Sequence, residues 1–135
     1  MKYLTFYDTS GKICLTFSGE ESIVEQVKLS QVSLSSLEGF YGFREYYIED
    51  SIAKLRPEQS TIVDKEEILA NGIDVLTISS APDNATFTAF DITNNLQLSG
   101  TFSGSETFST TKPGTIRILI EKFPYLPFEK IIYAV

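Results

Sequence analysis

Two short runs of mostly apolar residues, rich in aromatic and β-branched side chains, stand at the start of the chain. Lys2–Tyr7 and Lys12–Phe17 are these runs, and the polar turn sequence Asp8-Thr9-Ser10-Gly11 separates them. Aromatic and β-branched residues favour β-strands, and Asp first and Gly last in the turn favour a type I turn or its bulged relative. The pattern therefore predicts a β-hairpin that ends at Ser18-Gly19.

The pattern of apolar positions becomes helical after this hairpin. Over Glu20–Lys28, the apolar residues Ile23, Val24 and Val27 have helical spacing, with acids early and Lys28 late. This arrangement predicts about two turns of amphipathic helix. A strand is the alternative, because Val and Ile also favour strands.

Aromatic residues are densest in the segment that precedes the middle of the chain. A turn at Glu49-Asp50-Ser51 follows them, and Ile52–Leu55 has the pattern of a short return strand. The polar, proline-containing stretch Arg56–Ser60 then marks a candidate boundary between two parts of the chain. The aromatic residues of this cluster are Phe40, Tyr41, Phe43, Tyr46 and Tyr47.

The remainder of the chain contains short β-branched or aromatic runs separated by turn sequences. Their regular spacing of roughly 8–12 residues predicts an all-β sandwich. Glu66–Ala70 could add a first strand, and a short helix that begins with an Asp64/Glu67 capping box is the alternative. The runs are Ile73–Ser79, Ala85–Asp91, Leu96–Phe102, Thr115–Glu121 and Lys130–Ala134.

A proline-bracketed aromatic corner follows the fourth of these runs. Pro124 and Pro127 cannot donate to a strand ladder, which favours an edge or a corner over a central strand. The aromatic residues of the corner are Phe123, Tyr125 and Phe128. Both aromatic clusters are candidate interaction surfaces, since Tyr is enriched at protein interfaces. The alternative is that they fill the core, and for the first cluster we expect about three of the five rings to do so, because rings on a strand divide between two faces.

Composition and charge exclude several classes of protein. The hydrophobic fraction of 42%, with ten Phe and seven Tyr, is that of a globular chain. The net charge of −7 repels phosphate backbones and anionic lipids, so we expect no nucleic-acid partner. We see no secretory signal and no apolar run near the ~20 residues that span a bilayer, and we expect a cytosolic protein without membrane insertion.

The residues available for catalysis are limited. The chain contains no histidine, which excludes Ser-His-Asp triads, Cys-His pairs and histidine-ligated metals. Cys14 is the one cysteine, and the pattern predicts a small buried apolar residue rather than a nucleophile. A carboxylate pair remains a possible acid–base site, although scattered surface acids are far more common. We predict no enzyme activity.

Ligand motifs are also weak. Asp83, Asp91 and Glu106 are the loop acids that could meet around a cation, but acids that form turns are the simpler explanation. Gly100–Gly104 lacks the P-loop lysine and predicts a hairpin. The sequence therefore predicts no cofactor and no metal.

Several segments in order along the chain resemble a family of small proteins encoded beside tail genes in tailed phages and prophages of Gram-negative bacteria. The Pro-Gly-Thr strand followed by Phe-Pro-Tyr-Leu is the most specific element. Thr93–Thr111 is longer and richer in Ser and Thr than the usual hairpin of that group. The matching segments are Tyr3–Phe17, Tyr46–Ile52 with Arg56-Pro57, Ala70–Asp74, Ile78–Phe87, Pro113–Ile118 and Phe123–Leu126.

The resemblance implies an N-terminal part followed by a compact immunoglobulin-like module. Together with the strand pattern, it predicts an all-β or β-dominated chain, with α+β character at the N-terminus. The expected parts are a hairpin and short helix over residues 1–56, a linker over 57–63 and an immunoglobulin-like β-sandwich over 64–135. The implied role is a non-enzymatic tail or assembly protein in the host cytoplasm or the virion. Its expected partner is a tail or tail-fibre protein, and a homo-oligomer is compatible with this role. A carbohydrate-binding module that recognises a bacterial surface glycan is the alternative.

Overall fold

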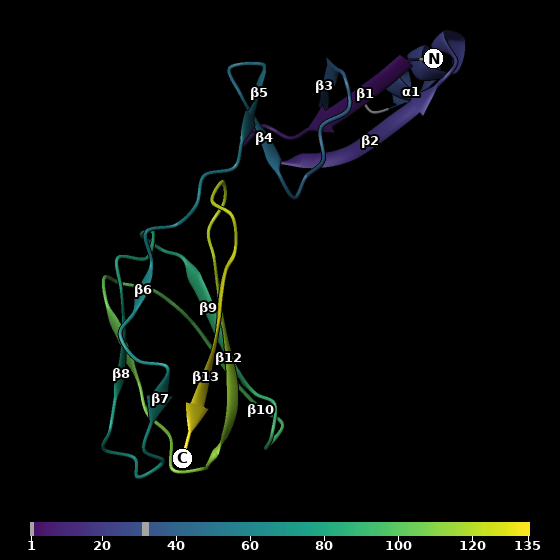
Figure 1. Ribbon diagram of the computed structural model, residues 1–135. Helices are drawn as coiled ribbons and strands as arrows, with labels where there is room; N and C mark the ends of the chain where they lie inside the picture. The colour runs from purple at the N-terminus through teal and green to yellow at the C-terminus, as the bar shows by residue number, and fades with distance from the viewer. Residues whose placement is uncertain (1, 31–32) are drawn as a thin grey trace. The chain divides into compact units, whose positions relative to one another are not determined.

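The protein is β-dominated and consists of two compact units. The computed structural model describes residues 2–30 and 33–135, and the chain divides after Pro57, so that the second unit begins at Glu58 (Figure 1). Most of the expected linker therefore belongs to the second unit. Gln59 is hydrogen-bonded there, and the strand β6 (Ile62–Val63) lies within the same stretch. A polar side chain and two β-branched residues of the expected linker thus have partners in the sandwich.

The first unit contains the predicted hairpin and helix. Strands β1 (Lys2–Tyr7), β2 (Ile13–Gly19) and β3 (Ser35–Glu38) form an antiparallel sheet in the order β2-β1-β3. Helix α1 (Glu21–Ser30) packs on one face of this sheet, which confirms the helix and excludes the strand alternative. The core between them consists of Leu4, Phe6 and Val24, with Phe17, Val27 and Leu34 packed around it.

The hairpin β1–β2 contains a bulge. Phe6 lies opposite Leu15, but Tyr7 lies opposite Ile13, so Cys14 is an extra residue on β2. The turn before it is held by the Asp8 carboxylate, which accepts hydrogen bonds from the backbone N–H groups of Ser10 and Lys12. An extra residue in one strand turns its neighbours and leaves the local ladder incomplete.

A second small hairpin completes the first unit. Strands β4 (Tyr46–Glu49) and β5 (Ile52–Leu55) pair antiparallel, as the sequence predicts. The two residues that join them, Asp50 and Ser51, both have positive φ angles, at 53° and 59°. Positive φ at both central residues is the signature of a type I′ turn, whose twist matches that of the strands.

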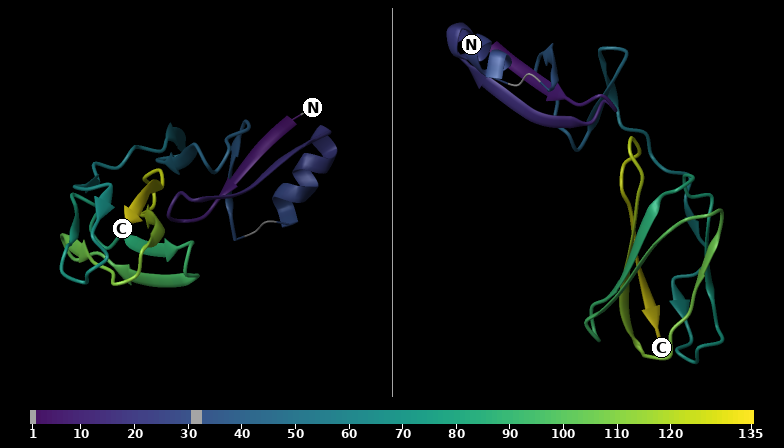
Figure 2. Two further views of the ribbon diagram at one scale, coloured as in Figure 1. Left: turned by 60° about the horizontal axis from the view of Figure 1, so that its bottom comes forward. Right: turned by 180° about the vertical axis from the view of Figure 1, so that it is seen from behind.

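The second unit is a β-sandwich (Figure 2). One sheet has the order β10-β9-β12-β13-β7 and the other the order β11-β8-β6. Their facing sides share one core, which includes Leu76, Ile78, Phe102, Ile116 and Ile118. The remaining strands are β7 (Glu67–Ile68), β8 (Leu76–Ser79), β9 (Thr86–Asp91), β10 (Leu96–Thr101), β11 (Glu106–Phe108), β12 (Gly114–Glu121) and β13 (Phe128–Ala134).

The strand order corresponds to an immunoglobulin-like sandwich. Strands β6, β8 and β11 occupy the places of A, B and E in one sheet, and β10, β9, β12 and β13 those of C′, C, F and G in the other. The first strand switches between sheets: β6 pairs antiparallel with β8, and β7 pairs parallel with β13. The predicted strand near Glu67 is therefore confirmed, and the capping-box helix is excluded.

The segment Gly100–Gly104 differs from the sequence prediction. It does not turn β10 back on itself but carries the chain across to β11, which pairs with β8 in the other sheet. Phe102 lies within this crossing and is buried, with its ring 5.3 Å from that of Phe87. Burial of this aromatic ring in the core directs the chain between the sheets, and the Ser- and Gly-rich sequence alone does not reveal it.

Strand β12 is the central strand of the five-stranded sheet. Ile116, Ile118 and Ile120 point into the core, while Arg117 on the opposite face pairs with Glu129 of β13 at 2.9 Å. The corner of residues 123–127 then joins β12 to β13, as the two prolines predict. The Gln59 side chain donates to the carbonyls of Ile120 and Leu126 and so ties this corner to the start of the unit.

Candidate functional site: an aromatic groove on the first unit

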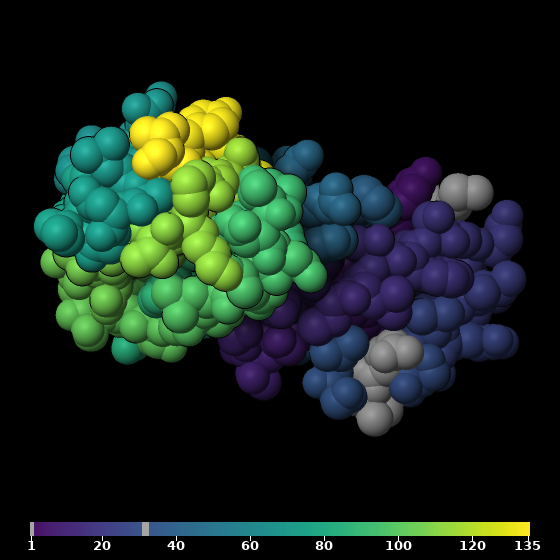
Figure 3. Space-filling model, turned by 90° about the horizontal axis from the view of Figure 1, so that it is seen from below, coloured from purple at the N-terminus to yellow at the C-terminus, as the bar shows by residue number. Residues whose placement is uncertain are grey.

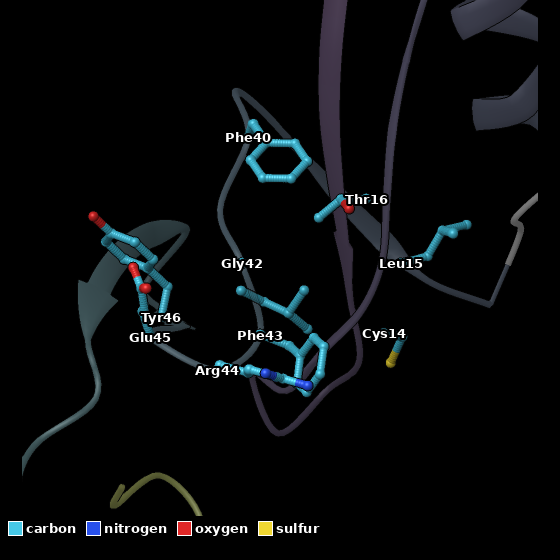
Figure 4. Close-up of a pocket in the computed structure, with 10 residues that line it drawn as sticks. Cys14, Leu15, Thr16, Phe40, Gly42, Phe43, Arg44, Glu45 and Tyr46 are labelled. Atoms are coloured by element: carbon cyan, nitrogen blue, oxygen red, sulfur yellow. The ribbon is translucent and has the colours of Figure 1, made fainter.

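An apolar groove of about 610 Å³ lies in the first unit between β2 and the segment that precedes β4. Residues 13–16 of β2 line one side, and Phe40 with residues 42–46 lines the other (Figure 4). This groove lies on the face of the sheet opposite α1, because the residues of β1 that face away from the helix contact the lining segment. Thr5 and Tyr3 are these residues.

The buried hydroxyl of Thr5 holds the aromatic segment on the sheet. Its Oγ1 donates to the carbonyl of Gly39 at 2.9 Å and accepts from the N–H of Tyr41 at 3.0 Å. Phe40 lies between these two anchored residues, so its backbone position is fixed while its side chain is free to face the solvent. The groove is thus formed by a loop with defined backbone contacts.

The five predicted aromatic residues divide into two groups. Phe40 and Phe43 are exposed by 62% and 60%, whereas Tyr41, Tyr46 and Tyr47 are half-buried. None of the five belongs to the core that α1 covers. The structure therefore leaves two phenylalanine rings exposed and three tyrosine rings half-buried.

Ring contacts support this arrangement. Phe40 meets Tyr3 edge to face at 6.4 Å, and Tyr41 meets Tyr46 in the same way at 5.3 Å. The Arg44 guanidinium lies 5.7 Å from the centre of the Phe43 ring, which is a cation–π distance. The rings are thus held in part by their neighbours, and their exposed faces border the groove.

The backbone edge of β2 beside the groove is unpaired. The N–H of Gly39 donates to the carbonyl of Tyr3, so the backbone N–H and C=O groups of Tyr3 point toward β3. Successive residues of a strand direct these groups to opposite sides, so those of Leu4 point toward Phe17 of β2. The backbone groups of Thr16 and Ser18 consequently point away from β1. Among the described residues, neither is bonded to another backbone group.

Tyr47 and Glu49 form an electrostatic pair at the end of β4. The Tyr47 hydroxyl donates to Glu49 Oε2 at 2.9 Å, and Lys54 lies 3.3 Å from Oε1. The hydrogen bond from Tyr47 and then Lys54 lower the pKa of Glu49, and the bond to Glu49 raises the pKa of Tyr47. Both shifts keep Glu49 ionised and Tyr47 neutral at pH 7. The pair therefore stabilises the hairpin, and neither of the two groups titrates near pH 7.

The prediction that Cys14 is buried was wrong. Its side chain is exposed at the margin of the groove, and its Sγ donates to the carbonyl of Lys12 at 3.4 Å. The bulge explains the difference, because Cys14 is the extra residue of β2 and has no partner opposite it in β1. A single sequence gives no direct signal for such a bulge.

The C-terminal aromatic cluster belongs to the second unit and does not line this groove. Phe123, Tyr125 and Phe128 are half-buried, and Phe128 packs against the sandwich core. Tyr125 also donates its N–H to the carbonyl of Lys122, which closes the turn of the corner. The Phe128 side chain therefore contributes to the sandwich core, and the backbone of Tyr125 closes the corner.

The three loop acids do not form a cation site. Asp91 is buried and accepts hydrogen bonds from the side chain and then the backbone N–H of Asn94, which lower the pKa of its carboxyl group. Glu106 lies in the other sheet of the sandwich, where β11 places it opposite Ile78 of β8. Asp83 lies in the exposed turn before β9. Within residues 2–30 and 33–135, no three acids or cysteines lie close enough to hold a metal ion.

Sequence reasoning missed several groove residues. Leu15 and Thr16 come from β2, and Arg44 and Glu45 come from the turn before β4. Arg44 and Glu45 interrupt the aromatic cluster, and this position in the sequence is the signal that could have identified them. The β2 residues could not be identified because they reach the groove through the packing of a separate segment over the sheet.

Comparisons with protein-family models, with curated proteins and with solved structures find no match for this chain. The helix of the described residues is too short and too polar to cross a membrane.

Proposed function

We propose that this chain is a non-enzymatic structural or assembly-accessory protein of a phage or prophage tail and that it acts through contacts with other proteins. The observation that carries the proposal is the groove of the first unit, where two exposed phenylalanine rings border an unpaired strand edge. The resemblance to tail-associated proteins is the reason to place the chain in a phage tail, and the groove is the surface that we expect to contact the partner.

The chemistry of the groove fits a protein partner. Phenylalanine rings that are about 60% exposed offer apolar area that water solvates poorly. Arg44 and Glu45 lie at the same groove and offer charges of both signs. An apolar centre with a polar margin is the usual composition of a protein–protein interface.

A binding experiment tests this proposal. The purified protein is used to capture each tail and tail-fibre protein encoded near its own gene. We expect one of them to bind, and the double variant Phe40→Ser/Phe43→Ser to lose that binding. Ile73→Ser is the matched control, because Ile73 is 82% exposed but lies in the second unit. No capture by the wild-type protein, or equal capture by the double variant, would contradict the proposal.

A carbohydrate-binding module is the second candidate. The observation that favours it is the exposure of the same two rings, since sugars stack on aromatic faces while a few polar groups fix their orientation. Thr16, Arg44 and Glu45 would supply the polar groups. In this role the ligand would be a bacterial surface glycan.

Glycan binding is tested with oligosaccharides from the bacterial surface. Titration calorimetry and quenching of tyrosine fluorescence would report binding near Tyr46, and Phe43→Ser would weaken it. If the oligosaccharides cause no heat and no quenching while a tail protein binds, the protein-contact role is favoured over the glycan role.

A further inference from the structure

The second unit has one edge strand that the sandwich leaves incompletely covered. Strand β10 forms the edge of the five-stranded sheet, and the opposite sheet has only three strands. Leu96 and Leu98 lie opposite Asp91 and Ala89 of β9, both of which are buried and face the interior. The two leucines therefore face the interior side as well, yet they are 48% and 53% exposed.

A small depression adjoins these leucines. It has a volume of about 150 Å³, and Leu96, Leu98, Ala89, Phe108 and Ile116 are among the residues that line it. Phe108 belongs to β11, the edge strand of the opposite sheet. The depression thus lies where the two sheets separate at this margin. The green part of the chain, which includes β10, is on the visible face of the second unit in Figure 3.

The outward backbone groups of β10 are unpaired. The N–H of Phe102 donates to the carbonyl of Ala85, so the even-numbered residues of β10 bond to β9. Gln97, Ser99 and Thr101 consequently direct their N–H and C=O groups away from the sheet. No backbone hydrogen bond from another described residue reaches them.

Strand β10 also lacks the features that normally protect a sheet edge. It has six residues, none of them charged and none of them proline, and its pairing with β9 contains no bulge. The other edge strands of this unit are short, with two residues in β6 and β7 and three in β11. Charges, prolines, bulges and shortness are the usual protections of edge strands, so β10 is the edge that a further strand would extend.

We propose that β10 pairs with β10 of a second copy of this chain. In an antiparallel arrangement centred on Ser99, each Ser99 exchanges two backbone hydrogen bonds with its counterpart. Leu98 then lies opposite Gly100 of the other copy, and glycine leaves room for the leucine side chain. The two five-stranded sheets would join into one continuous sheet across the two-fold axis.

Charge favours a second copy at this place. The chain carries a net charge of −7, so two copies repel each other over most of their surfaces. The segment 95–105 has no charged residue and is therefore a surface on which equally acidic copies can meet without local repulsion. On its solvent side, Gln97 of one copy would face Thr101 of the other, and both can form hydrogen bonds.

Two double variants test both the pairing and its register. In Gln97→Lys/Thr101→Lys, lysine faces lysine across the axis, whereas in Gln97→Lys/Thr101→Glu each lysine faces a glutamate. These side chains are exposed, so both variants are expected to fold. Like charges directly opposite each other destabilise paired strands and opposite charges stabilise them, so the two dissociation constants should differ by about tenfold or more.

The measurement is sedimentation equilibrium of the full chain over a wide range of concentrations. We expect the wild-type mass to rise from 15.1 kDa toward twice that value. The lysine–glutamate variant should remain dimeric at concentrations at which the lysine–lysine variant is a monomer. A wild-type protein that stays monomeric, or two variants that associate equally, would overturn the proposal, as would growth into large species without a dimer plateau.

A backbone variant gives an independent test. Ser99→Pro removes the N–H at the centre of the proposed pairing and leaves the ladder with β9 intact, because that N–H points outward. Ser99→Ala retains the N–H and should dimerise like the wild type. If circular dichroism shows that the proline variant does not fold, the two charge variants still decide the question.

Discussion

Thr5 and Gly39 are joined by a hydrogen bond from a fully buried hydroxyl to a backbone carbonyl, at 2.9 Å, across 34 residues of chain. The same hydroxyl oxygen accepts the N–H of Tyr41. The residue between these partners is Phe40, whose exposed ring borders the groove. A side chain within the sheet therefore sets the position of the surface that we assign to binding.

Replacement of Thr5 by Val keeps the shape of the side chain and removes both hydrogen bonds. The carbonyl of Gly39 and the N–H of Tyr41 then lose their partner, which costs about 1–3 kcal/mol of folding free energy. Thr5→Ser retains the hydroxyl and should cost less. Hydrogen exchange should become faster at Tyr41 in Thr5→Val, and unchanged exchange there would contradict this role for the hydroxyl.

Gly11 is required by the contact between the first hairpin and β4. Its φ is +88°, and a Cβ added at this position would collide with the backbone carbonyl of Ile48. Gly104 is the matched control, since its φ is +120° but no atom lies within 4 Å of an added Cβ. We expect Gly104→Ala to cost about 1–2 kcal/mol from backbone strain alone and Gly11→Ala about 3–5 kcal/mol, because it adds overpacking. Chemical denaturation measures both, and equal losses would show that the contact with Ile48 is unimportant.

The elements predicted from the sequence are those with a clear period and clear turn residues. The first hairpin, α1, the pair β4–β5 and the strands β9, β10, β12 and β13 all have such patterns. Strands β6 and β11 were missed because two or three residues are too few to show a period. Strand β3 was missed as well, because both residues of its first half are serines and do not favour a strand.

Long-range packing explains the remaining differences. The burial of Phe102 directs the chain from one sheet to the other, and the exposure of Cys14 follows from a bulge that depends on how β1 and β2 pair. The candidate site was predictable only in its aromatic members. Its other side belongs to β2, and no local pattern shows that residues 40–46 pack over that strand.

Gln59 provides a test of the boundary between the two units. Its side-chain amide donates to the carbonyls of Ile120 and Leu126 at 2.8 and 2.9 Å, and its Oε1 accepts the hydroxyl of Thr61. Gln59→Ala should therefore destabilise the second unit by about 1–3 kcal/mol, since two part-buried carbonyls lose their donor. The neighbouring Ser60 is exposed, so Ser60→Ala is the control and should change stability by less than about 0.5 kcal/mol. Thermal unfolding of both variants is the measurement, and a neutral Gln59→Ala would mean that this stretch behaves as a linker, as the sequence predicts.

Asp91 makes the stability of the second unit depend on acid. The hydrogen bond from the Asn94 side chain, and after it those from backbone N–H groups, lower the pKa of the Asp91 carboxyl below the usual range of an aspartate. A carboxyl whose pKa is lower in the folded than in the unfolded state contributes stability above the unfolded pKa, and this contribution is lost as the pH falls through the folded pKa. The free energy of unfolding should therefore decrease below about pH 4. Asp91→Asn cannot titrate and should be less stable than the wild type at pH 7, with a smaller loss in acid. Urea denaturation at a series of pH values between neutral and strongly acidic compares the two, and parallel curves for wild type and variant would show that Asp91 does not contribute to the acid sensitivity.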